Sequence, residues 1–214
     1  MTTGLRMLAA AIGWFAVGLQ YWLVVTGDIG PDPVNRTINF FSYFTILTNI
    51  IAALAMTVPL VAPGSILGRF FNAPSIRTAI ATYIIVVGVV YHLVLRDLWD
   101  PQGWQWIADM SLHYVTPVLF ALDWLLFVPK RSVPWATAMH ALAYPIAYMG
   151  WTLWHGSWSG FYPYPFVDVS QIGLDKTLQN AAGMTVAFLV LCLVLIAVGR
   201  LLGLLQPSAR PTAA

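Results

Sequence analysis

The sequence predicts an all-α polytopic membrane bundle of six transmembrane helices, with both termini on the cytoplasmic side. The 214 residues are 59% hydrophobic and only 8% charged, whereas soluble domains carry about a quarter of charged residues. Apolar runs long enough to cross a bilayer recur along the chain and lack the polar face of a soluble helix. Pro and Gly clusters separate these runs, as is typical of connecting loops.

The six spans follow from the apolar runs. The first is about as long as a bilayer span and lacks a small-residue cleavage site, so we expect an uncleaved first helix. Residues 1–205 are predicted to form one six-span domain, and residues 206–214, rich in Pro, Ser and Ala, a disordered cytoplasmic tail. The spans are expected at residues 6–26, 38–62, 75–95, 107–128, 134–155 and 178–204.

Basic residues predict the orientation, because cytoplasmic loops carry an excess of Lys and Arg. Those on one predicted side outnumber those on the other, which favours a multi-pass protein of the cell (inner) membrane with both termini inside. The acidic residues, apart from Asp123, fall on or near the outer side. The inner group is Arg6, Arg69, Arg77, Lys130, Arg131, Arg200 and Arg210, and the outer group is Arg36, Arg96 and Lys176.

Other classes of function find little support. The single cysteine, Cys192, lies inside the last apolar run, so the sequence contains no disulfide framework and no Cys-based metal motif. The basic residues are scattered singly or in pairs and form no stripe that would bind nucleic acid. We expect no cofactor and no bound metal, and the sequence indicates no particular protein partner.

Polar residues inside the spans are the most informative feature, because polar groups are costly in hydrocarbon. They follow helical spacing on the second, fourth and fifth spans, and the third span adds a pair near its outer end. They are Ser42, Thr45, Thr48 and Asn49; Asp109, His113, Thr116 and Asp123; His140, Tyr144, Tyr148 and His155; and Tyr91 with His92.

Two of these residues, Thr45 and His113, are expected at the same depth in the membrane. The second and fourth spans both enter from outside, and Thr45 and His113 lie about seven and six residues past their starts, which places both at roughly 10 Å depth. A neutral imidazole can take the proton of a threonine hydroxyl during attack on an ester carbonyl. The pattern thus predicts Thr45 as nucleophile and His113 as general base. We expect His92 and His155 at the mouth of the same cavity.

Supporting roles follow from the neighbours. Asp109, one turn above His113, is placed to orient the imidazole, and Asn49 or a Tyr hydroxyl is placed to donate to the developing oxyanion. A purely structural interpretation also applies, because Thr in membrane helices usually bonds the backbone one turn back or packs at helix contacts.

Two further functions compete with the esterase. In a small-molecule or proton-coupled transporter, Asp123, Asp109 and the histidines would relay protons, although the sequence contains no inverted repeat. In a metal or haem protein, His92, His113, His155 and Asp109 would supply ligands from the outer side, although no HExxH motif is present.

Three strings carry a resemblance to a known family: residues 40–49 (FFSYFTILTN), 112–117 (LHYVTP) and 162–166 (YPYPF). They resemble the bacterial Pr-six-Pr family of six-span membrane proteins, itself similar to the eukaryotic androgen-induced membrane proteins. The resemblance implies a membrane threonine hydrolase that cleaves fatty acid esters of hydroxy fatty acids, with Thr45 as nucleophile and His113 as base. Thr48 and Asn49 stand where the eukaryotic relatives are expected to carry an acid, so Thr48 is a second candidate nucleophile.

Overall fold

The computed structural model describes residues 2–27 and 32–205, and within these ranges every regular element is a helix. Five helical stretches are long and apolar enough to cross a membrane. This confirms the prediction of an all-α polytopic bundle, while the predicted tail at residues 206–214 lies outside the described residues. The five stretches are α1 (Thr2–Thr26), α3 (Phe44–Val61), α5 with η1 and η2 (Pro74–Leu98), α6 with η3 and α7 (Trp104–Phe127), and α11 (Leu174–Leu205).

Shorter elements complete the fold. The π-helical segments η1 (Tyr91–Leu95) and η3 (Ser111–Val115) interrupt the third and fourth predicted spans, so α5 itself ends at Val90, α6 at Met110, and α7 begins at Thr116. The others are α2 (Pro33–Phe40), α4 (Ile66–Asn72), η2 (Arg96–Leu98), α8 (Thr137–Ala141), α9 (Ala143–Ser159), η4 (Pro165–Val167) and α10 (Val169–Ile172).

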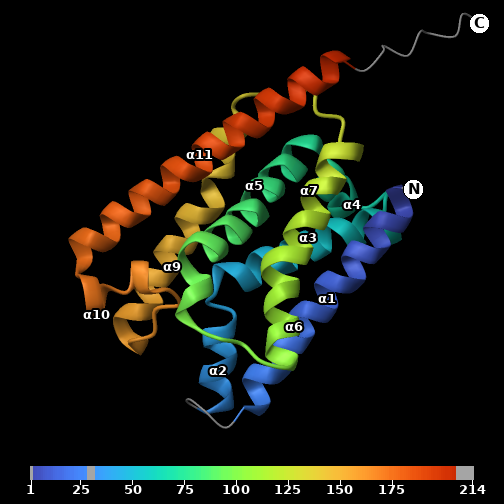
Figure 1. Ribbon diagram of the computed structural model, residues 1–214. Helices are drawn as coiled ribbons and strands as arrows, with labels where there is room; N and C mark the ends of the chain where they lie inside the picture. Colours follow the sequence, from blue (N-terminus) through green and yellow to red (C-terminus); the bar gives the residue numbers. More distant parts are fainter. Residues whose placement is uncertain (1, 28–31, 206–214) are drawn as a thin grey trace, which may run out of the picture.

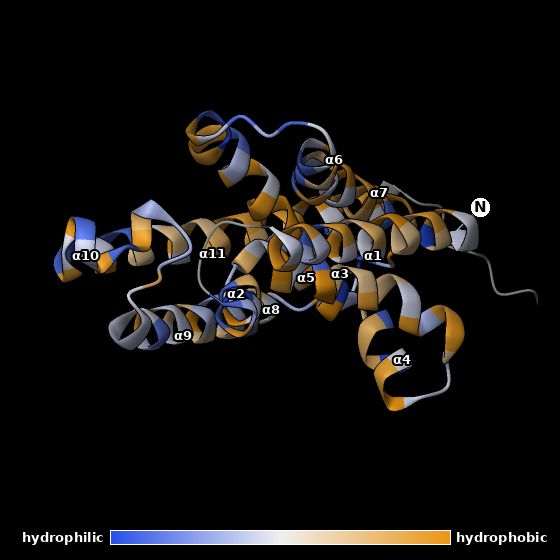
Figure 2. Ribbon diagram, turned by 90° about the horizontal axis from the view of Figure 1, so that it is seen from below, coloured by the Kyte–Doolittle hydropathy of each residue, from blue (hydrophilic) through white to orange (hydrophobic). Residues whose placement is uncertain are grey.

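α5 forms the centre of the bundle and packs against α3, α7 and α11, while α1 packs against α3, α6 and α7. The start of α1, α4 and the end of α11 lie toward one end of the bundle, which we call the terminal end (Figure 1). α2 and α10 lie at the opposite end. The long helices are mostly apolar in colour, whereas α2 and α10 carry hydrophilic residues (Figure 2).

The pattern of burial is that of a membrane protein. α7 exposes Val118 and Leu126, which are 56% and 58% exposed, while it buries Thr116 and Asp123. A helix in a soluble protein shows the reverse, with apolar residues inside and polar residues outside. The apolar surface of the bundle therefore matches a hydrocarbon surrounding.

The second predicted span is not one helix, because the chain breaks between α2 and α3 at residues 41–43. No Gly or Pro marks this break. Ser42 is instead held by α9, since the Tyr148 hydroxyl donates to its carbonyl oxygen at 3.0 Å and the Trp151 Nε1–H donates to its Oγ at 3.2 Å. The prediction of a continuous span over 38–62 was wrong at this point, and tertiary hydrogen bonds are the cause.

The fifth predicted span, residues 134–155, is also divided. A turn at Leu142 separates α8 from α9, and α9 has 17 residues. Gly160, in the left-handed region with φ of 71°, ends α9 and reverses the chain. The following loop packs back on α9 so closely that a Cβ at Gly156 would lie 2.1 Å from the Tyr162 ring.

Buried charges tie the terminal end together. Asp123 on α7 is fully buried and accepts hydrogen bonds from Arg6 Nε at 2.7 Å and from Arg77 at 2.6 Å. Arg77, which the sequence grouped with the basic residues of the inner side, is only 1% exposed and also donates to the carbonyl oxygens of Ala55 and Phe71. We call Arg6, Arg77 and Asp123 the ionic cluster, and it joins α1, α5 and α7.

Candidate functional site

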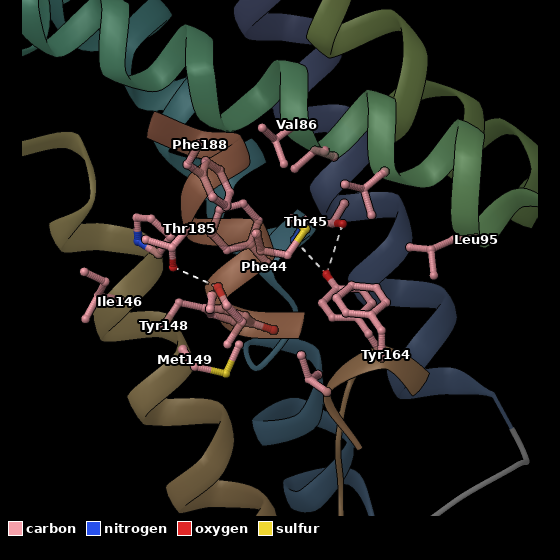
Figure 3. A pocket seen from close by; sticks show the side chains of 18 residues that line it. Phe44, Thr45, Val86, Leu95, Ile146, Tyr148, Met149, Tyr164, Thr185 and Phe188 are labelled. Atoms are coloured by element: carbon pink, nitrogen blue, oxygen red, sulfur yellow. Dashed lines mark hydrogen bonds between the residues drawn. The ribbon is translucent and has the colours of Figure 1, made fainter. Parts of the chain in front are cut away.

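Thr45 is the second residue of α3, directly after the break in the chain. The first backbone N–H groups of a helix have no partner within it. The N–H of Thr45 donates to the Tyr164 hydroxyl at 3.1 Å, and the Thr45 Oγ1 is hydrogen-bonded to the same hydroxyl at 3.2 Å. Figure 3 shows both bonds, with the Tyr164 ring extending from its loop toward Thr45. The break thus creates the local backbone geometry of the site.

Tyr164 belongs to the loop that follows α9, and burial of its phenol raises its pKa to about 12. The hydroxyl therefore keeps its proton at neutral pH. Because the oxygen accepts the Thr45 N–H, its own hydrogen is free to be donated to Thr45 Oγ1 or to a ligand. Tyr164 can act as a neutral hydrogen-bond donor at the start of α3.

His113 has a defined tautomer. Its Nδ1 lies 3.0 Å from the backbone carbonyl oxygen of Asp109, which can only accept a hydrogen bond, so Nδ1 carries the proton. The Asp109 Oδ1 lies 3.1 Å from the same nitrogen, outside hydrogen-bond geometry but close enough for electrostatic attraction. In the neutral imidazole, Nε2 is then the nitrogen that can accept a proton, as a general base requires.

Tyr91 fixes the ring of His113 from the other side. The two rings stack with centroids 3.9 Å apart and planes 12° from parallel, and the Tyr91 hydroxyl donates to Asp109 Oδ2. Tyr91 lies in η1 and His113 in η3, and π-helical turns are frequent at functional sites. α5 approaches η3 closely here, because a Cβ at Gly88 would lie 3.0 Å from the His113 carbonyl oxygen.

Thr45 and His113 line one cavity of about 380 Å³, which we call the polar cavity. No hydrogen bond joins the two residues in the described part of the chain, since the Thr45 hydroxyl is bonded to Tyr164. Catalytic hydrogen bonds often form only in the substrate complex. The wall of the polar cavity consists of Gln20, Val24, Phe40, Tyr43, Thr45, Ile46, Tyr91, Leu95, Leu98, Trp99, Gln105, Asp109, Leu112, His113, Pro163, Tyr164 and Pro165.

A second cavity, of about 220 Å³, lies on the other side of Thr45 and is shown in Figure 3. We call it the apolar cavity, because its walls come mostly from aliphatic and aromatic residues of α3, α5, α9 and α11, among them Val86, Ile146 and Phe188. Thr45, Tyr164 and Leu95 line both cavities. The candidate nucleophile thus stands at the boundary between two cavities, and the one that it shares with His113 has more polar side chains in its wall.

Thr48 and Asn49 lie elsewhere. Thr48 is fully buried, bonds the Tyr144 hydroxyl at 3.0 Å and lines neither cavity. Asn49 Nδ2 donates to the carbonyl oxygens of Thr45 and Leu112, so it ties α3 to η3 and has no position for an oxyanion. The geometry gives both residues structural contacts.

His92 and His155 do not line the mouth of the cavity as expected. His92 is exposed and lies 3.1 Å from the Tyr114 hydroxyl, while His155 is 1% exposed and stacks on Trp151. The helical spacing was correct, but it does not determine which side of α5 or α9 faces the site. Over residues 2–27 and 32–205, no three His, Cys, Asp or Glu side chains gather as a metal site requires.

Asp123 lies apart from Asp109 and is engaged by two arginines. It is fourteen residues from Asp109 along one helical stretch, a separation of about 20 Å, and both its oxygens are engaged by arginines. A carboxylate held in this way is poorly suited to relay protons. The arrangement therefore gives no support to the transporter alternative.

Sequence reasoning missed Tyr91 and Tyr164 as site residues. Tyr91 was noted only as a polar residue near the end of its span, and Tyr164 only as part of the YPYPF string. A tyrosine between two prolines in a loop was the available signal, because such a segment is stiff.

No family model, no curated protein and no solved structure matches the chain.

Proposed function

We propose that this protein is a membrane-embedded threonine hydrolase that cleaves a fatty-acyl ester, such as a fatty acid ester of a hydroxy fatty acid. The supporting observation is the placement of Thr45 beside two cavities, with His113, whose Nδ1 is bonded to the Asp109 carbonyl oxygen, lining one of them. The resemblance of residues 40–49 and 112–117 to the Pr-six-Pr family points to the same chemistry.

The reaction would proceed in two stages. Thr45 Oγ1 attacks the ester carbonyl carbon and its proton moves to His113 Nε2. The bond from that carbon to the alcohol oxygen then breaks, and His113 returns the proton to the leaving alcohol. A water molecule attacks the acyl-threonine, again giving its proton to His113. Thr45 recovers its proton as the fatty acid leaves.

The start of α3 supplies the groups that would stabilise the oxyanion. Helix N-termini carry partial positive charge and unpaired N–H groups. The Tyr164 hydroxyl lies at this point, where its oxygen already accepts the Thr45 N–H, so its own hydrogen would be the donor to the oxyanion. Donors aimed at a developing oxyanion are often the largest single contribution to catalysis. Tyr164 takes the role that the sequence assigned to Asn49 or an unspecified Tyr.

The same proposal includes the topology: six crossings of the inner membrane with both termini in the cytoplasm. Support comes from the excess of Lys and Arg on one side and from the start of α1 and the end of α11, which lie toward one end of the bundle (Figure 1). Cysteines introduced at the exposed Ser65 and Ser170 should react with an impermeant maleimide from opposite sides of the membrane, and reaction from the same side would refute the topology.

The decisive experiment measures hydrolysis by purified protein in nanodiscs. Thr45→Val, which keeps the shape and removes the hydroxyl, should lower the rate on the order of 1,000-fold, and His113→Gln should lower it about 100-fold or more. Thr48→Val is the matched control and should retain the wild-type rate. A fluorophosphonate lipid probe should modify Thr45. Equal rates for Thr45→Val and wild type would end the proposal.

A further inference from the structure

We propose, resting on the hydrolase function above, that the apolar cavity holds the acyl chain and the polar cavity holds the alcohol part of the ester. The substrate is then an ester with two unlike parts: an apolar acyl chain and an alcohol that bears a further hydrogen-bonding group. Three features of the walls and of the proton path support this assignment.

The first feature is where the cavities meet. Their walls share Thr45, Tyr164 and Leu95 and no other residue. A carbonyl carbon bonded to Thr45 Oγ1 therefore lies at the boundary, with its two substituents extending to different sides. The two parts of a bound ester, on either side of its carbonyl carbon, therefore lie in different cavities.

The second feature fixes the direction. His113 lines the polar cavity and not the apolar one. The oxygen of the leaving alcohol must receive its proton from Nε2 of this residue, so that oxygen lies on the polar side. The acyl chain, which stays on Thr45 after the alcohol departs, must then extend into the apolar cavity.

The third feature is the chemistry of the walls. Apart from Thr45 and Tyr164, which the two cavities share, the hydroxyls of the apolar cavity have partners inside the protein, since Thr185 donates to the Ala181 carbonyl oxygen and Tyr148 to the Ser42 carbonyl oxygen. This cavity offers little to a polar ligand. The polar cavity contains the amides of Gln20 and Gln105, which bond each other at 2.7 Å and retain further donors and acceptors.

The apolar cavity also reaches the surface of the bundle. Ile146 of α9 lines it and is 56% exposed, and residues of the neighbouring α11, including Ala181 and Thr185, form the facing wall. In a bilayer this surface contacts lipid tails. An acyl chain can enter laterally between α9 and α11 without passing through water.

The test compares matched variants against a series of acyl chains. Ala181→Phe narrows the apolar cavity, whereas Ala187→Phe makes the same change at an exposed position of α11 outside it. With esters from butyryl to palmitoyl, Ala181→Phe should lower kcat/KM for palmitoyl about tenfold or more relative to butyryl. Ala187→Phe should keep the wild-type profile. An unchanged profile in Ala181→Phe would overturn the assignment.

A second measurement does not depend on turnover. A fatty acid with a diazirine at the end of its chain should crosslink, after irradiation, to α9 or α11 at the apolar cavity, and Ala181→Phe should abolish this labelling. Crosslinks in the polar cavity, on α1 or α6, would overturn the assignment. If wild-type protein hydrolyses no ester, the proposed function fails, and the crosslinks alone then decide whether the apolar cavity is an acyl-chain site.

Discussion

Two polar groups of residues are buried in this bundle, and they differ in what they leave unbonded. The ionic cluster at the terminal end engages both oxygens of Asp123 with arginines. The site at the opposite end keeps an unbonded imidazole nitrogen on His113 and places a hydroxyl, on Thr45, beside two cavities. Both are costly in hydrocarbon, but only the second has an atom and a space available for a ligand.

The comparison shows how to separate structural from functional polarity in a membrane helix. Asp109 and Asp123 are both acids on one helical stretch and both nearly fully buried. What distinguishes them is their partners: Asp123 meets two arginines, whereas Asp109 meets a tyrosine and a histidine. Both oxygens of Asp123 are occupied by arginines, whereas Asp109 helps to position His113.

Removal of Asp123 should give the largest effect on stability. Asp123→Ala leaves Arg6 and Arg77 without their counter-charge, and an unpaired buried charge costs about 3–5 kcal/mol. Thermal unfolding in detergent measures the loss. Asp97→Ala, which removes an exposed partner of Arg96, should have almost no effect. If the two variants unfold alike, the ionic cluster does not stabilise the bundle.

Tyr91→Phe should act on catalysis and leave the fold intact. The variant keeps the stacking on His113 and loses the hydrogen bond to Asp109. A hydrogen bond to a charged group contributes about 1.5–3 kcal/mol, so kcat/KM should fall about tenfold to a hundredfold and the pH profile of the rate should shift. Tyr114→Phe, a neighbouring tyrosine whose partner is His92, serves as control. Loss of stability without a shifted profile would make Tyr91 structural.

Lys130 provides a pH test of the terminal end. Its ammonium donates to the carbonyl oxygens of Trp124, Leu125 and Val128, and burial lowers its pKa below the usual 10.5. The unfolded chain binds this proton more tightly, so stability should rise with pH as the folded-state pKa is passed. Stability curves of wild type and Lys130→Met should diverge in that alkaline range, and parallel curves would contradict the assignment.

Thr48→Val should give the smallest effect. Its hydroxyl bonds Tyr144 away from both cavities, so loss of the bond should cost about 1 kcal/mol of stability and leave hydrolysis unchanged. Thr45 and Thr48 are three residues apart. Thr45→Val and Thr48→Val therefore test whether a functional and a structural polar residue can be told apart within one helical turn. A large loss of activity in Thr48→Val would move the nucleophile.

The helices could be predicted from composition, because an apolar run of bilayer length with few charges seldom forms anything but a membrane span. The break at residues 41–43 could not, since its cause is Ser42 bonding to Tyr148 and Trp151, more than a hundred residues away. The burial of Arg77 could not be predicted for the same reason, because its partner Asp123 lies 46 residues further on.

Part of the site was accessible to sequence reasoning. Depth along the second and fourth spans, which both enter from outside, indicated that Thr45 and His113 could meet, and the structure places both on the polar cavity. Rotation about each helix axis was not accessible, which is why His92 and His155 point elsewhere. The contribution of Tyr164 depends on how a loop folds back on the bundle, and no helical spacing encodes this.

The unequal lengths of two neighbouring helices have a consequence for the membrane itself. α9, with 17 residues, is about 25 Å long, whereas α11, with 32, is about 48 Å long. In the proposed six-span topology, hydrocarbon about 30 Å thick would match neither helix, which favours lipid that thins beside α9 and a tilt of α11. Residues of both helices line the apolar cavity, so its proposed lateral entrance would lie at this mismatch.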